Sequence, residues 1–371
     1  MLRKKIVFVF GSSDIGGAEK QALYLIRYIL EHQLFNVSCI VYSSKNGTLL
    51  SELGKLNIEF NSFENPLNAR NKFNKIKNLL NLLLTLRKHS PNIIIPYTNL
   101  PNVTVNLIWR FTGAKLSLWN QRDSGVDRLN FILEQFSIAN SSLIISNSNS
   151  GLNYLKSKFF LFGKKTYIIP NGIEFHQKLE KTSRYFEIAE SNKGKLIGLM
   201  LANLSEKKDH CTLILAWKKL ITNDLFSNAL LLLAGRFDSE YLKIKTLISD
   251  LNLEKHIFLL GEISDVSELI AISDLTILTS FSEGCPNALL EYCIEGKPFV
   301  GSDIDGIREF LCAESIQFLS NPLDHNKLAS NIELMFSDEN LRNRLGFLNK
   351  MHVENNFNNF QSVSRILKIL N

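Results

Sequence analysis

Two glutamates, Glu283 and Glu291, are separated by seven residues in the segment 280–310, SFSEGCPNALLEYCIEGKPFVGSDIDGIREF. An ionised carboxylate accepts hydrogen bonds at both of its oxygens, so it can bind two neighbouring hydroxyl groups of a sugar. The alternative is structural: Glu291 is then a solvated helix residue, and Glu283 interacts with the positive end of the helix dipole. The pair marks a candidate binding site for a ligand rich in hydroxyl groups.

A helix is predicted in this segment from about residue 286 to 295, because Pro286 is favoured at the first helical position and Gly296 ends helices. Its first unpaired N–H groups, from about Cys285 to Ala288, can hold an anion such as a phosphate. The apolar run IAISDLTILTS before the loop predicts a buried strand. Ligands of open α/β sheets bind at the carboxyl edge of the strands, so the carboxylates and the helix N-terminus form one candidate site.

The segment resembles the nucleotide-sugar motif of the retaining glycosyltransferases of family 4, which has the form EGxPNxxLE. The matching residues are Glu283, Gly284, Pro286, Asn287, Leu290 and Glu291. The resemblance implies that Glu291 binds the ribose hydroxyls of the donor, and that Glu283 binds a sugar hydroxyl and is catalytic. The other donor-binding residues that it implies are Gly284, Cys285, Pro286, Asn287, Ala288 and Leu290.

A second part of the donor site is expected in the stretch 202–209, ANLSEKKD. In the family, an arginine and a lysine five residues later bind the donor diphosphate. Alignment places the lysine at Lys208, which we predict to be catalytic, whereas the arginine position is Asn203. One cationic contact is thus unfilled, so stabilisation of the leaving group is expected to come more from Lys208, from Lys207 if the loop is shifted by one residue, or from Arg236.

A glycine-rich loop follows the first apolar run. Residues 5–10 predict a strand buried on both faces, and GSSDIGGAEK then leads into an amphipathic helix. The loop has no GxGxxG, which argues against a nicotinamide cofactor. In the family a similar loop followed by Ala-Glu lines the cleft, which implies cleft positions for Gly16 and Gly17. The alternative is a tight turn that packing alone requires.

Arg122 is a third candidate cleft residue. It lies in NQRDSG, after a strand predicted at 115–119, and therefore at the carboxyl edge of the sheet. Many relatives have a histidine near this point that touches the donor sugar, and this sequence has none. Arg122 either meets phosphate there or is an ordinary surface arginine.

Apolar runs alternate with helical stretches along the chain, which is typical of doubly wound α/β domains. The resemblance implies the GT-B fold, in which two Rossmann-like domains face each other across a cleft. We expect an acceptor-binding domain at 1–175, a linker at 176–195 and a nucleotide-sugar-binding domain at 196–355. A C-terminal helix at 356–371 is expected to return towards the first domain.

The composition is that of a folded protein long enough for two domains, with 371 residues, 45% hydrophobic residues and a mean hydropathy of +0.01. The net charge of +6 suits anionic ligands or an anionic lipid surface, and no motif indicates a nucleic-acid partner. Five scattered cysteines without a CxxC pair fit a reducing compartment. Neither a signal peptide nor a transmembrane stretch is predicted, so we expect a cytoplasmic location.

No metal or other cofactor is expected. The seven histidines form no HExxH or other ligand grouping. The sequence Asp303-Ile304-Asp305 has the Asp-x-Asp form found in some metal-dependent carbohydrate enzymes. It follows the glutamate pair in a glycine-containing turn, and a match of three residues easily arises by chance.

Residues 69–89, ARNKFNKIKNLLNLLLTLRKH, have the pattern of a basic amphipathic helix. Such a helix can lie on an anionic membrane surface, where each basic residue near the headgroups contributes roughly 1 kcal/mol. The alternative is a crossover helix whose leucines pack on the sheet, and both can be true of different faces. A second basic and aromatic cluster, residues 154–165, also favours peripheral membrane contact.

The sequence thus predicts a retaining glycosyltransferase that moves a sugar from a nucleoside-diphosphate-sugar, expected to be a UDP-sugar, to a saccharide acceptor. The acceptor is expected to be lipid-linked, in the assembly of a cell-surface polysaccharide such as O-antigen, capsule or lipopolysaccharide, at the inner face of the cytoplasmic membrane. Two alternatives stay open. The missing arginine at Asn203 fits a catalytically silent nucleotide-sugar-binding module, and a nucleotide-sugar epimerase can have a similar two-domain fold.

Overall fold

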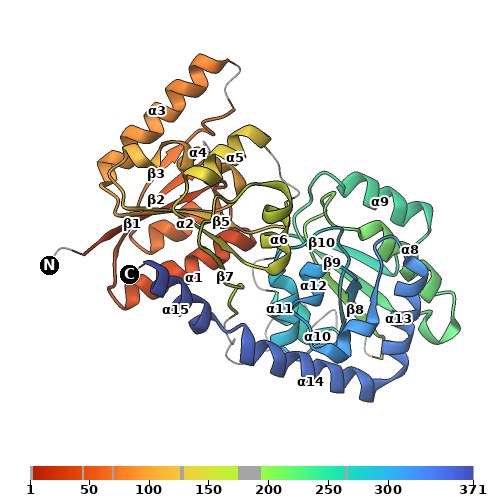
Figure 1. Ribbon diagram of the computed structural model, residues 1–371. Helices are drawn as coiled ribbons and strands as arrows, with labels where there is room; N and C mark the ends of the chain where they lie inside the picture. The colour runs from red at the N-terminus through yellow and green to blue at the C-terminus, as the bar shows by residue number, and fades with distance from the viewer. Residues whose placement is uncertain are drawn as a thin grey trace. The chain divides into compact units, whose positions relative to one another are not determined.

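The computed structural model divides into two compact units (Figure 1). Unit 1 consists of Met1–Gly172 and Asn359–Asn371, and unit 2 is Ile173–Asn358. The structure describes residues 3–43, 46–68, 71–125, 129–173, 194–263 and 266–370. Most of the linker expected at 176–195 lies outside these ranges. No helix of the described residues is long and apolar enough to span a bilayer.

Unit 1 contains, within the described residues, a seven-stranded sheet in the order β3-β2-β1-β4-β5-β6-β7, and all neighbouring strands pair in parallel. The strands are β1 (Lys5–Phe10), β2 (Asn36–Tyr42), β3 (Glu59–Phe63), β4 (Ile93–Pro96), β5 (Leu116–Gln121), β6 (Leu143–Ser146) and β7 (Thr166–Ile168). All side chains of β1 after Lys5 are fully buried, as expected for a central parallel strand. The strand order reverses between β1 and β4, which is the arrangement of a doubly wound fold.

Helices connect the strands of unit 1. They are α1 (Gly17–Glu31), α2 (Thr48–Lys55), α3 (Lys72–His89), α4 (Asn99–Ile108), α5 (Phe131–Asn140), α6 (Asn149–Lys158) and, after unit 2, α15 (Asn359–Leu370). The glycine-rich loop ends in the N-terminus of α1. There Gly16 is the N-cap residue, and its N–H donates to Glu19 Oε2 at 3.1 Å, so the Ala-Glu that follows the glycines closes the first turn of the helix.

Two strands of unit 1 differ from the prediction. The strand β3 was not predicted, because EFNSF is largely polar and lies at the edge of the sheet, where most of its side chains are exposed. Asn120 and Gln121 were predicted in a loop, but they are the last, buried residues of β5. The side chain of Asn102 in α4 satisfies the backbone of Asn120, accepting its N–H at 2.9 Å and donating to its carbonyl at 2.8 Å.

Unit 2 contains a six-stranded parallel sheet within the described residues, in the order β10-β9-β8-β11-β12-β13. The strands are β8 (Ile197–Leu201), β9 (Leu230–Ala234), β10 (Ile257–Gly261), β11 (Leu275–Leu278), β12 (Phe299–Ser302) and β13 (Leu319–Ser320). The helices are α8 (His210–Leu220), α9 (Tyr241–Asp250), α10 (Ser267–Ile272), α11 (Asn287–Ile294), α12 (Asp305–Arg308), α13 (His325–Ser337) and α14 (Glu339–Asn356). The predicted α/β class with two Rossmann-like domains is confirmed.

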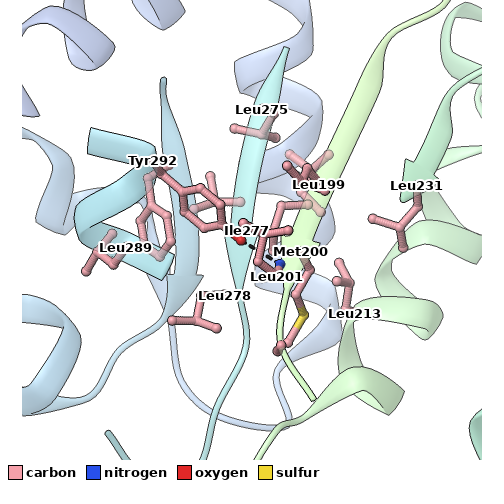
Figure 2. Packing of buried hydrophobic residues seen from close by; sticks show 14 of the residues in the cluster. Leu199, Met200, Leu201, Leu213, Leu231, Leu275, Ile277, Leu278, Leu289 and Tyr292 are labelled. Atoms are coloured by element: carbon pink, nitrogen blue, oxygen red, sulfur yellow. Dashed lines mark hydrogen bonds between the residues drawn. The ribbon is translucent and has the colours of Figure 1, made fainter. Parts of the chain in front are cut away.

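One polar contact crosses the apolar core of unit 2 (Figure 2). The fully buried hydroxyl of Tyr292 on α11 accepts the N–H of Leu201, the last residue of β8, at 2.6 Å. Leu199, Ile277 and Leu289 pack in the same core. Because an unmade hydrogen bond is costly in such surroundings, this bond fixes α11 relative to β8.

Candidate functional site

Three loops meet at the carboxyl edge of the sheet in unit 2, after the neighbouring strands β9, β8 and β11. The loop after β8 is paired with the loop after β11 through an antiparallel bridge between Lys208 and Ser280. The N–H of Phe281 donates to the carbonyl of Lys207 at 3.0 Å, and the N–H of Asp209 donates to the carbonyl of Thr279 at 3.0 Å. These backbone bonds hold the two predicted halves of the donor site together.

The pairing brings the two predicted catalytic residues into contact. Lys208 Nζ and Glu283 Oε1 form an ion pair, and the hydroxyl of Ser280 donates to the same carboxylate oxygen at 2.6 Å. The side chains are only 20% and 12% exposed, respectively. A positive and a negative group are therefore held against each other in a mostly buried position.

The loop that carries Glu283 lies against the short helix α12, which follows β12. A Cβ atom on Gly306 would lie 2.1 Å from the carbonyl oxygen of Glu283 and 2.9 Å from that of Gly284. The hydroxyl of Ser302 accepts the N–H of Ser280 at 2.9 Å. The prediction from sequence did not include Ser280, Ser302 or Gly306 as site residues. Of the three, only Gly306 could have been noticed, because it is the glycine of the predicted turn.

The helix α11 starts directly after this loop, with Pro286 as its N-cap residue. Gly284 and Cys285 are buried beside it, whereas Asn287 and Ala288 are half-buried. Glu291 is 8% exposed. Leu290 is fully buried in the hydrophobic core, so its side chain supports the packing of the helix.

The loop after β9 brings Arg236 next to Asn203. The side chain of Asn203 accepts the N–H of Arg236 at 3.1 Å, and the N–H of Leu204 donates to the carbonyl of Arg236 at 3.0 Å. The residue before Arg236 is Gly235, which has a φ of +156°. A Cβ on Gly235 would lie 2.1 Å from the carbonyl oxygen of Ala202, so a side chain at this position would push the loops after β8 and β9 apart. The guanidinium of Arg236 is about half exposed and lies 3.8 Å from Asp238.

The two residues that follow Lys208 were not predicted as part of the site. Asp209 is the N-cap of α8; its Oδ1 accepts the N–H of Thr212 at 3.1 Å, and its Oδ2 accepts that of Leu323 at 3.3 Å. Burial, followed by the nearby ammonium of Lys208, lowers the pKa of His210 to about 4. The ring is therefore neutral at pH 7 and adds no charge beside Lys208.

The predicted cleft residues of unit 1 lie at the carboxyl edge of its own sheet. Gly16 and Gly17 begin α1, after β1. Arg122 follows β5 directly; its Nη2 donates to Asn171 Oδ1 at 2.6 Å, and its guanidinium lies 5.5 Å from the ring centre of Tyr97. These contacts hold the arginine in one orientation.

The two aspartates of the Asp-x-Asp sequence lie at the start of α12. Asp303 forms an ion pair with Arg308, and Asp305 is the first residue of α12. Among the described residues, no three or more histidines, cysteines, aspartates or glutamates group in a way that could hold a metal ion.

Comparison with known proteins finds similar sequences and structures. Residues 181–348 match the model of the family described as Glycosyl transferases group 1. An uncharacterized glycosyltransferase of Methanocaldococcus jannaschii is 24% identical over 65% of this chain, and the match spans 63% of that protein, which is less than two thirds of its length. A Campylobacter jejuni protein, the N-acetylgalactosamine-N,N'-diacetylbacillosaminyl-diphospho-undecaprenol 4-alpha-N-acetylgalactosaminyltransferase, is 26% identical over 92% of both chains.

The crystal structure of Anabaena Alr3699/HepE in complex with UDP and glucose has the same fold, with a TM-score of 0.84 and 19% identity over 99% of both chains. Residues 181–348, less than half of the chain, thus match the glycosyl transferases group 1 model, and the structural likeness shows a GT-B type fold. The domain and the relatives support the predicted class of enzyme, a glycosyltransferase.

Proposed function

We propose that the protein is a retaining glycosyltransferase of family 4 that moves a sugar from a nucleoside-diphosphate-sugar, preferably a UDP-sugar, to a saccharide acceptor. The observation that carries the proposal is the Lys208–Glu283 ion pair, which lies between the loops after β8 and β11 and directly before the N-terminus of α11. A cation, a hydrogen-bonding carboxylate and a helix N-terminus are the groups that a diphosphate joined to a sugar requires.

In this proposal the donor lies along the loops of unit 2. Glu291 binds the ribose hydroxyls, Glu283 binds a hydroxyl of the transferred sugar, and the backbone from Gly284 to Asn287 binds sugar or phosphate. The ammonium of Lys208 binds the diphosphate. Arg236, which the loop after β9 brings next to Asn203, supplies the positive charge that the family takes from an arginine at that position.

The reaction exchanges one bond to the anomeric carbon for another. The bond to the diphosphate oxygen breaks, the bond to the acceptor oxygen forms on the same face, and the acceptor proton passes to the departing phosphate oxygen. The protein then has to position the reactants and stabilise the negative charge that develops on the diphosphate. Lys208 is suited to the second task because its ion pair already fixes its position. No metal cofactor is part of the proposal.

We further propose that the acceptor is a lipid-linked saccharide used in the assembly of a cell-surface polysaccharide, at the inner face of the cytoplasmic membrane. The name of the Campylobacter relative, which aligns over nearly the whole chain, specifies an acceptor linked to undecaprenol through a diphosphate. Among the candidate functions, this one accounts for both the donor motif and the basic amphipathic helix α3 of unit 1.

The test is an incubation of the protein with UDP-, GDP- and ADP-sugars, with and without an extract of lipid-linked saccharides, followed by measurement of nucleoside diphosphate and product mass. We expect that release of nucleoside diphosphate requires the extract and that the product is heavier than the acceptor by one sugar. The rate of this release should be much lower in Glu283→Gln. The control is Glu314→Gln, which changes an exposed glutamate of unit 2 and should leave release unchanged.

Other outcomes would support the alternatives. Donor binding without release would favour the silent binding module, and an isomerised donor formed without extract would favour the epimerase. An inverted anomeric centre in the product, determined by NMR, would contradict the retaining mechanism.

A further inference from the structure

The helix α3 has apolar residues on two opposite sides. Leu82 and Leu86 are fully buried against the sheet of unit 1. Phe73, Ile76, Leu80 and Leu84 are 75%, 58%, 54% and 53% exposed. Because successive residues turn by about 100° around a helix axis, these four side chains form one stripe, nearly opposite the two buried leucines. We call these four residues the outer stripe.

The outer stripe is not needed for the folding of unit 1. A crossover helix that only packs on a sheet requires one apolar side, and its other side is normally polar. The first two turns of α3 contain no buried residue, and in Figure 1 the helix projects beyond the strands of its sheet. A contiguous exposed apolar surface on such an element is typical of an interaction site.

The charges around the outer stripe indicate what it contacts. Lys72, Lys77 and Lys88 on α3 are exposed, and α3 contains no aspartate or glutamate. The wider segment 65–122 contains nine lysines and arginines and no acidic residue. An apolar stripe whose charged neighbours on the helix are all positive is complementary to a surface that is negative outside and apolar beneath, which is the surface of an anionic bilayer.

We propose that the outer stripe of α3 lies in the headgroup region of an anionic phospholipid bilayer, with the apolar side chains inserted and the flanking lysines on the lipid phosphates. The inference rests on the proposed lipid-linked acceptor and adds to it the element that holds the enzyme at the membrane. It assigns different functions to the two sides of one helix, since the side with Leu82 and Leu86 packs in the protein core.

The first test measures co-sedimentation of the protein with vesicles of equal parts phosphatidylglycerol and phosphatidylcholine, and with vesicles of phosphatidylcholine alone. The variant replaces the four stripe residues by glutamine (F73Q, I76Q, L80Q and L84Q), which keeps helix propensity. We expect its partitioning onto the anionic vesicles to fall by about tenfold or more. The matched control replaces four exposed apolar residues of unit 2 (L225Q, L242Q, L334Q and F347Q) and should bind as the unmodified protein does.

A second test locates the stripe directly. In Phe73→Trp, the indole emission should shift to shorter wavelength when anionic vesicles are added, and brominated lipid chains should quench it. Equal binding of the glutamine variant and the unmodified protein, or no shift of the indole emission, would overturn the proposal. A concentration-dependent dimer that the stripe variant abolishes, without vesicle binding, would instead make a second copy of this chain the partner.

Sugar transfer is measured separately, so that the two proposals can fail independently. With detergent-dispersed acceptor, the stripe variant should release nucleoside diphosphate as fast as the unmodified protein, and it should be slower only when the acceptor is in vesicles. If the protein consumes none of the donors offered but the stripe variant still loses vesicle binding, the transfer proposal fails and the membrane inference stands. Unchanged release from acceptor in vesicles would show that the stripe does not serve this reaction.

Discussion

Lys208 and Glu283 form an ion pair although 74 residues separate them in the chain. The pair exists because the loops after β8 and β11 are joined by backbone hydrogen bonds, and the hydroxyl of Ser280 donates to the same carboxylate oxygen at 2.6 Å. Each charge stabilises the other in a little-exposed position. The site therefore depends on the relative placement of two loops as much as on the two side chains.

Replacing Lys208 by methionine should affect both catalysis and stability. Methionine keeps the length of the side chain but cannot bind a diphosphate, so we expect the rate of nucleoside diphosphate release to fall by about 10²–10³-fold. The mostly buried Glu283 also loses its counterion, which should lower the free energy of unfolding by about 1–3 kcal/mol. Single-turnover rates and urea unfolding measure the two effects. A variant with normal release would contradict the proposed function of Lys208.

Replacing Gly306 by alanine should displace the loop of Glu283. The new Cβ would lie 2.1 Å from the carbonyl oxygen of Glu283, so the backbone must move, and we expect a loss of about 1–3 kcal/mol in unfolding free energy. Donor affinity should fall with it. The control is Gly54→Ala, since Gly54 is inside α2 with no atom within 4 Å of a new Cβ; it should stabilise by about 0.5–1 kcal/mol.

Replacing Tyr292 by phenylalanine tests the bond between α11 and β8. The N–H of Leu201 would lose its acceptor in the core, and the expected cost is about 1–3 kcal/mol in urea unfolding. Tyr241→Phe, at a partly exposed position on α9, should change stability by less than about 0.5 kcal/mol. A cost no larger than that of the control would mean that the hydroxyl of Tyr292 does not stabilise unit 2.

Acid should destabilise unit 2 through His210. Its pKa is about 4 in the folded protein against 6.5 for an unperturbed histidine, because burial and then the ammonium of Lys208 disfavour the charged ring. The unfolded chain therefore binds the extra proton first. The contribution of His210 is complete above about pH 6.5 and is lost as the pH falls to about 4, by about 3 kcal/mol in total.

Urea unfolding of unmodified protein and His210→Gln across this pH range measures that contribution. The variant should lose less stability on acidification than the unmodified protein. Burial also lowers the pKa values of His89 and His352, so some acid sensitivity should persist in the variant. Parallel curves for the two proteins would show that His210 does not titrate in this range.

Much of the architecture could be predicted because its determinants are local. Buried parallel strands such as β1 and β9 are continuous apolar runs, and Pro286 and Gly296 bound the helix α11. Strand β3 and the end of β5 could not be predicted in this way. Strand β3 is stabilised by pairing at a sheet edge, and Asn120 at the end of β5 is stabilised by the side chain of Asn102 in α4.

The candidate site was predictable in composition but not in contacts. The motif around Glu283 and the lysine at 208 were identified by resemblance, which indicates residues but not their partners. The ion pair itself, the hydroxyl of Ser280 and the close approach of Gly306 depend on loops that meet only after the sheet has formed. Likewise, the periodicity of α3 predicted an amphipathic helix, whereas only burial shows that it has two apolar sides.

Unit 1 is completed by a segment that follows all of unit 2 in the chain. The chain passes from unit 1 to unit 2 after Gly172 and returns to unit 1 at Asn359. A Cβ on Gly172 would lie 2.4 Å from the Cα of Asn359, and the N–H of Ile173 donates to the carbonyl of Phe357 at 3.0 Å, so these two connecting segments run side by side. During synthesis, unit 2 therefore leaves the ribosome before α15, whose Phe360 packs against Tyr28 of α1. In evolution, a module whose two ends meet can be exchanged by recombination without lengthening either connection.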